Sequence, residues 1–116
     1  MGATNFDETH FGKNVKEAYA DAVDDARFEY GFDPYNGTIS TTNGVYLFPK
    51  EVHPRYGTKK FNDWVDDILD EKIKSPVEKR GRAGAVEIPR SYIRKHYPHL
   101  KGKRGKMFYF FGWAAT

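Results

Sequence analysis

Residues 107–114 read Met-Phe-Tyr-Phe-Phe-Gly-Trp-Ala, and their composition predicts a β-strand. Side chains alternate between the two faces of a strand, and here both faces are apolar. Met107, Tyr109, Phe111 and Trp113 share one face; Phe108, Phe110 and Ala114 share the other. Two interpretations follow. The strand is either central and buried on both faces, or part of a sheet with one open aromatic platform that stacks bases.

The sequence upstream of this strand alternates between helical and extended patterns. Helical periodicity predicts a helix over residues 14–30, capped by Asn14, and a second one capped by Thr58 and ended by Ser75-Pro76. A short helix is expected over residues 90–97. Strands are predicted over 4–11, 38–41, 45–48 and 85–88, and Thr42-Asn43-Gly44 is expected to join the second and third as a hairpin.

These elements give the order β-α-β-β-α-β-(α)-β in a single globular domain, residues 1–116. The mixture predicts an α+β fold with helices packed on one face of a mainly antiparallel sheet, and a ferredoxin-like arrangement is the nearest common pattern. Besides the last strand, the expected core consists of Tyr19, Ala22, Val23, Ala26, Trp64, Val65, Ile68, Leu69, Val86 and Ile88.

Charge is distributed very unevenly along the chain. Residues 1–71 hold seven Lys/Arg and fourteen Asp/Glu, whereas residues 72–116 hold twelve Lys/Arg and two Asp/Glu, so the net charges are −7 and +10. Such a separation of charge says more about what the protein binds than about how it folds. It suggests a basic surface for phosphates or for an acidic macromolecule.

Two basic, glycine-rich loops carry most of this positive charge. Their cations are the predicted phosphate- or nucleic-acid-binding residues, because flexible glycines beside Lys and Arg let amides and cations converge on a phosphate. The alternative is a pair of solvated surface loops. The residues are Lys79, Arg80, Arg82, Lys101, Lys103, Arg104 and Lys106.

The first predicted helix carries an acidic ladder at i,i+4 spacing. It is either a solvated face or a docking stripe for a basic partner, and it offers a head-to-tail contact for a homo-oligomer. The candidate partner-docking residues are Asp21, Asp25, Tyr109 and Trp113.

The residue types argue against catalysis and against a metal site. The chain has no cysteine, and Pro98 interrupts the helix between His96 and His99. The serines lack a nucleophile-elbow motif, and neither glycine loop has nucleotide-fingerprint spacing. We therefore expect no cofactor, no metal and no catalytic residue, with a small enzyme as the less favoured alternative. A signal peptide and a membrane-length apolar run are both absent from the sequence, so a cytoplasmic location is expected.

Several segments in order resemble uncharacterised small accessory proteins of tailed bacteriophages, especially those of actinobacteria. They are Glu17-Ala18-Tyr19, Ala26-Arg27-Phe28-Glu29-Tyr30-Gly31, Tyr35-Asn36-Gly37-Thr38-Ile39, Gly84-Ala85-Val86 and Phe110-Phe111-Gly112-Trp113-Ala114. The resemblance implies a non-enzymatic binding protein in the cytoplasm of the host cell, of the host-takeover or anti-defence type. Its implied partner is a host protein or nucleoprotein complex, with nucleic acid or a nucleotide as further candidates; it brings no catalytic residues.

Overall fold

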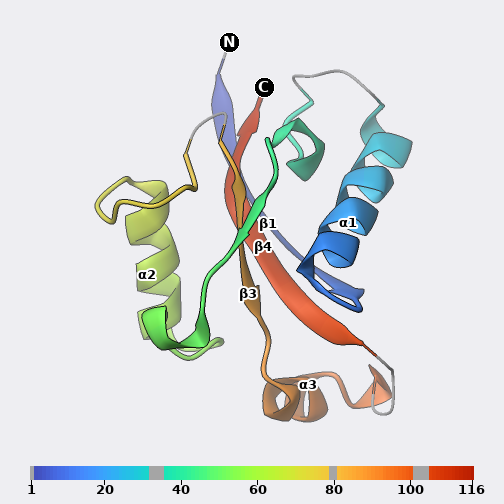
Figure 1. Cartoon of the computed structure of the whole chain (residues 1–116), viewed down its shortest axis with the longest axis vertical. Helices are drawn as coiled ribbons and strands as arrows, with labels where there is room; N and C mark the ends of the chain where they lie inside the picture. The colour runs from blue at the N-terminus through green and yellow to red at the C-terminus, as the bar shows by residue number, and fades with distance from the viewer. Residues whose placement is uncertain (1, 32–35, 79–80, 101–104) are drawn as a thin grey trace.

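The structure is a computed structural model that describes residues 2–31, 36–78, 81–100 and 105–116. Its centre is a four-stranded sheet in the order β1-β4-β3-β2 (Figure 1). The strands are β1 (Ala3–Gly12), β2 (Val45–Leu47), β3 (Ala83–Glu87) and β4 (Lys106–Ala115). β4 pairs antiparallel with both β1 and β3, and β2 pairs with β3 in parallel. The predicted α+β class and mainly antiparallel sheet are confirmed.

In the described ranges, three α-helices and three short 3-10 segments complete the fold. The helices are α1 (Val15–Tyr30), α2 (Lys59–Leu69) and α3 (Arg90–His96), and the 3-10 segments are η1 (Ile39–Thr41), η2 (Lys50–Val52) and η3 (Pro98–Leu100). The predicted caps are confirmed: Asn14 accepts from the amide of Glu17, and Thr58 accepts from the amide of Phe61. No helix in the described part of the chain is long and apolar enough to cross a membrane.

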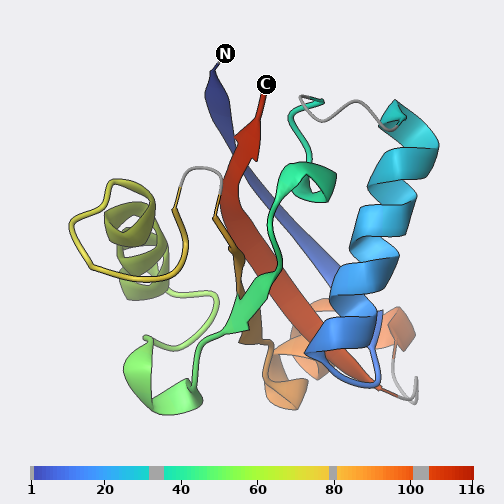
Figure 2. The same ribbon diagram turned by 45° about the horizontal axis from the view of Figure 1, so that its top comes forward.

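The two long helices cover opposite faces of the sheet, which corrects the prediction of helices on one face. Alternate residues of β4 explain the arrangement: Phe108 and Phe110 pack with α1, whereas Phe111 packs with α2. The same separation of α1 and α2 by the sheet is visible from two directions (Figures 1 and 2). A strand that is apolar on both faces needs a cover on each, so the one-face prediction conflicted with the sequence of β4 itself.

β4 is therefore the buried central strand, as the first interpretation of residues 107–114 predicted. Phe110 and Phe111 are fully buried, on opposite faces. The alternative, an open aromatic platform, is wrong for this strand. The rings of Tyr109 and Phe61 lie 5.7 Å apart, and the indole of Trp113 donates to the carbonyl of Leu69 at 3.0 Å, so α2 covers that face.

The predicted hairpin around Thr42-Asn43-Gly44 is also wrong. Residues 39–41 form η1 instead of a strand, because the Thr38 side chain accepts from the amide of Ser40 and caps a helical turn. β2 then pairs in parallel with β3, in the register Val45 to Ala83. A parallel pair needs a long crossover, which here contains α2, so the ferredoxin-like arrangement is not formed.

Candidate binding surfaces

The structure describes two of the seven predicted phosphate-binding cations. Arg82 is exposed and directly precedes β3, and Lys106 is exposed at the first position of β4. The other five, Lys79, Arg80, Lys101, Lys103 and Arg104, lie outside the described residues.

Arg82 and Lys106 belong to opposite ends of the sheet. The register pairs Gly84 with Phe111, which places Arg82 level with Trp113, seven residues along β4 from Lys106. At the rise of an extended strand, this is a separation of roughly 23 Å. The two described cations of the basic loops, Arg82 and Lys106, thus do not share one surface.

Gly84 is part of the sheet and allows close packing between two strands. It lies within β3 and is buried, and a Cβ built on it would meet Phe111 ring carbons at 2.7 and 2.9 Å. The glycine is needed because the neighbouring strand places an aromatic ring against its backbone. The strand predicted over residues 85–88 therefore begins earlier, at Ala83, and includes Gly84.

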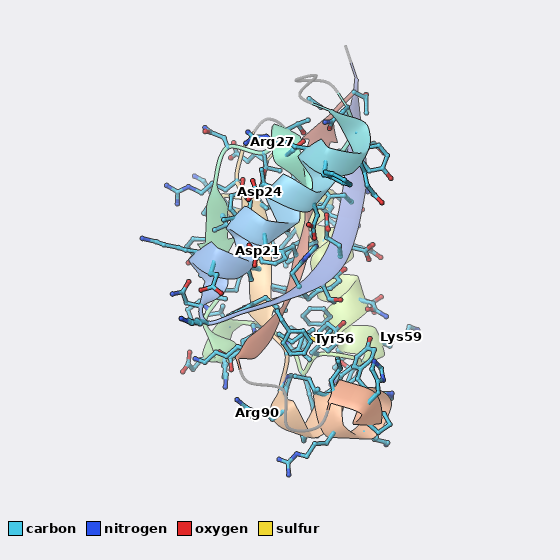
Figure 3. The ribbon with its side chains drawn as sticks, turned by 90° about the vertical axis from the view of Figure 1, so that its right-hand side faces the viewer. Asp21, Asp24, Arg27, Tyr56, Lys59 and Arg90 are labelled. Atoms are coloured by element: carbon cyan, nitrogen blue, oxygen red, sulfur yellow. The ribbon has the colours of Figure 1, made fainter. Side chains whose placement is uncertain are left out.

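One end of the molecule gathers exposed cations from three separate elements. We call this set the basic end; Figure 3 shows two of its members, Lys59 beside Tyr56 and Arg90 at the start of α3. The Tyr56 and Tyr92 rings lie 4.8 Å apart, which joins the start of α2 to α3. Arg90 donates from Nη2 to the Gly105 carbonyl at 3.2 Å, which joins α3 to the start of β4. Its members, all exposed, are Lys59, Arg90, Arg94, Lys95 and Lys106.

Glu87 is the carboxylate that contacts this set. It lies at the end of β3, with its oxygens 3.5 Å from Nζ of Lys106 and 3.7 Å from Nζ of Lys50. Both ion pairs are partly exposed, so each contributes little to stability. Four of the five cations, Lys59, Arg90, Arg94 and Lys95, have no carboxylate within ion-pair distance among the described residues.

The acidic side of the molecule is built from α1 and β1. Asp21 and Asp25 are exposed on α1, and Asp25 is turned towards β1, with its Oδ2 3.9 Å from Nδ1 of His10. The opposite ring nitrogen, Nε2, lies 2.6 Å from a Glu8 oxygen. That hydrogen bond, with the charges of Glu8 and the two aspartates, raises the pKa of His10 against the lowering effect of burial.

Tyr109 and Trp113, the other predicted docking residues, are half-buried and make intramolecular bonds. The Tyr109 hydroxyl donates to Oδ2 of Asp7 at 3.0 Å, and burial together with that carboxylate raises the pKa of Tyr109. Trp113 donates from its indole nitrogen to the last residue of α2. Both side chains therefore hold α2 and β1 against β4.

Two clefts flank β1, one on each face of the sheet. The α2-side cleft has a volume of about 350 Å³, and Asn5, Asp7, Asn62 and Asp66 provide its polar lining. The α1-side cleft has a volume of about 530 Å³; its lining includes Glu8, His10, Asp25, Phe28, Glu29 and Tyr30. The sequence analysis missed both clefts. Two adjacent acidic residues in a predicted strand, Asp7 and Glu8, were the available signal.

The paired histidines have packing roles. His96 stacks on Tyr92 with ring centroids 4.1 Å apart, and His99 meets Tyr97 edge to face at 6.2 Å. Within the described ranges, no three His, Asp or Glu side chains gather in a way that would hold a metal ion.

Comparisons of this chain with protein families, with curated proteins and with solved structures find no match.

Proposed function

We propose that this protein acts by binding rather than by catalysis, and that its basic end contacts the phosphates of a nucleic acid. The observation that carries the proposal is the convergence of five exposed cations from α2, α3 and β4 at one end of the sheet. Helix α3 alone supplies three of the five cations, which are Arg90, Arg94 and Lys95.

A polymer of phosphates suits this arrangement better than a single nucleotide does. The cations come from separate elements, and a nucleic acid presents regularly repeated charges along its length. Contacts of this kind give affinity without base specificity. If all five cations contact duplex DNA, the logarithm of the binding constant falls with the logarithm of salt concentration with a slope of about −4.5.

The test is fluorescence anisotropy with labelled duplex DNA and with single-stranded RNA, measured over a series of salt concentrations. The variant combines Arg94→Gln with Lys95→Gln and is expected to make the slope for duplex DNA shallower by about 1.8, at 0.9 for each lost phosphate contact. Circular dichroism checks that α3 is retained.

The matched control combines Lys72→Gln with Lys74→Gln. Both lysines are exposed, their loss changes the net charge equally, and they follow α2 rather than belonging to the basic end. We expect this control to leave the slope unchanged. Equal effects of the two double variants, or a wild-type protein that binds neither nucleic acid at low salt, would contradict the proposal.

The cellular role follows from the resemblance alone. Action in the cytoplasm of a phage-infected host, against a host protein or nucleoprotein complex, stays a prediction. A nucleic-acid-binding end is compatible with an anti-defence inhibitor that competes for a nucleoprotein target.

A further inference from the structure

β1 is a long strand at one edge of the sheet. It comprises ten residues and, among the strands of the described residues, is hydrogen-bonded to β4 alone. Gly2 and Thr116 exchange both backbone hydrogen bonds, and the register continues without interruption through β1. Every second residue from Gly2 is thus bonded towards β4, so the register directs the backbone groups of Asn5, Asp7 and Thr9 away from the sheet.

This edge lacks most of the features that protect edge strands. Proteins usually blunt such edges by shortness, proline, bulges or charged side chains, above all lysine. The opposite edge, β2, is only three residues long. β1 has ten residues, no proline and no lysine, and its unbroken register leaves no place for a bulge.

Both clefts next to the edge are acidic. The acidic residues of the α2-side cleft are Asp7 and Asp66. Those of the α1-side cleft are Asp7, Glu8, Asp25 and Glu29, so Asp7 borders both clefts. Among the described residues, His10 is the only basic side chain that lines either cleft.

The α1-side cleft also presents exposed aromatic rings. Phe28 is 93% exposed and Tyr30 60% exposed. A carboxylate beside an aromatic face suits a Lys or Arg side chain, since the ring binds the cation and its alkyl stem.

We propose that β1 is a docking edge for an extended basic segment of a partner protein, which adds to the sheet as a fifth strand. Main-chain hydrogen bonds to Asn5, Asp7 and Thr9 hold such a strand, and its side chains alternate between the two faces. A residue opposite Asp7 enters the α2-side cleft, and the next residue, opposite Glu8, enters the α1-side cleft. The preferred ligand therefore carries two consecutive basic residues.

A second copy of this chain suits the edge less well. Antiparallel pairing of two β1 strands requires outward-facing residues to meet outward-facing residues. The two registers with the greatest overlap then place either Asp7 or Glu8 opposite its own copy. Like charges directly opposite each other destabilise a strand pair, whereas a basic segment reverses the sign of that interaction.

The test uses a fluorescein-labelled peptide of nine residues, threonine and serine with a central Lys-Arg pair, measured by anisotropy at physiological salt. One comparison peptide replaces the pair by Gln-Gln. Another carries N-methyl groups on both central amides, so that one methyl group faces β1 whichever register forms. We expect each change to weaken binding about tenfold. The Gln-Gln peptide loses two partly exposed ion pairs, and the N-methylated peptide loses hydrogen bonds to the strand edge.

On the protein side, the test variant combines Asp25→Lys with Glu29→Lys, and the control combines Glu17→Lys with Asp24→Lys. All four residues are exposed on α1, but only the first two line the cleft; Figure 3 shows Asp24 on the outward side of the helix. The test variant should lose about tenfold in affinity, and the control less than about twofold, because neither control residue lines the cleft and exposed charges are screened by salt.

Three results would overturn the proposal: equal weakening by both double variants, unchanged binding of the N-methylated peptide, or no binding of the parent peptide. A fourth contradicting result could come from analytical sedimentation of the protein with and without the peptide. A stable dimer that the Lys-Arg peptide dissociates would assign the edge to a second copy. None of these results depends on nucleic-acid binding at the basic end, so the two proposals fail separately.

Discussion

A methyl group added at Gly84 tests the packing between β3 and β4. The Cβ of an alanine would lie 2.7 and 2.9 Å from Cζ and Cε1 of Phe111, and 2.9 Å from Cγ2 of Val77. Phe111 and Val77 are both buried, so neither side chain has free space to move into. Gly84→Ala is expected to destabilise the fold without touching any exposed cation.

The magnitude follows from two opposing effects. Overpacking of a well-packed core costs about 1–3 kcal/mol, and the reduced freedom of the unfolded chain offsets about 0.5–1 kcal/mol. The net loss is about 1–2 kcal/mol. With 116 residues and an unfolding entropy of about 2 cal/mol/K per residue, this lowers Tm by roughly 4–8 °C.

Urea and thermal unfolding of a double-mutant cycle measure this effect. Phe111→Leu removes the two ring carbons, so Gly84→Ala should cost less in that background than in the wild type. Gly112→Ala is the control: its nearest contacts are ring carbons of half-buried Phe6 at 3.2 and 3.3 Å, and its net cost should be near zero. Additive effects of the two Gly84 and Phe111 substitutions, or a neutral Gly84→Ala, would refute the packing argument.

Two further substitutions test individual bonds. Because Glu8 raises the pKa of His10, protonated His10 stabilises the fold fully below its unfolded pKa of about 6.5 and loses that effect as pH rises through the higher folded value. His10→Gln should therefore lower Tm more at pH 5.5 than at pH 8, and an equal loss at both would contradict the assignment. Trp113→Phe removes the indole bond to the Leu69 carbonyl and should cost about 1 kcal/mol in urea unfolding; an unchanged midpoint would show that the bond contributes nothing.

Local patterns in the sequence predicted most of the elements correctly. Apolar spacing and capping residues located α1 and α2 because both signals depend on residues within one or two turns. Alternation along residues 107–114 predicted which side chains of β4 share a face, and the two core clusters confirm it. The prediction for α2 extended too far: the helix ends at Leu69, Glu71 follows with a φ of 62°, and Ile73 is exposed.

Pairing between distant segments could not be predicted in the same way. Thr42-Asn43-Gly44 has the composition of a hairpin turn, but β2 finds its partner in residues 83–85, beyond α2. The hydroxyl of Tyr19 accepts from the amide of Gly44, and the amide of Asn43 donates to the Gly81 carbonyl. These hydrogen bonds hold residues 42–44 in a conformation other than a hairpin turn. Their partners, Tyr19 and Gly81, lie more than twenty positions away in the sequence.

The candidate surfaces depend on topology in a similar way. Sequence alone shows that residues 72–116 are basic, but not that Arg82 and Lys106 are separated along β4. It shows Asp7 and Glu8 in a strand, but not that this strand lies at a sheet edge. The cations of α3 were not among the predicted phosphate-binding residues, and only the contacts of α3 with the start of β4 place them at one end of the molecule.

The outer edge of β1, with its acidic clefts, and the basic end both belong to the strand pair β1–β4. Gly12, the last residue of β1, pairs with Lys106, and Asp7 lies five residues before it. That distance is roughly 17 Å, about two Debye lengths at physiological salt. The two surfaces are therefore largely screened from each other, so the net charge of +3 is not a measure of either one. A polyanion at one surface and a basic segment at the other should each show its own salt dependence, and occupancy of one should change the affinity of the other only weakly.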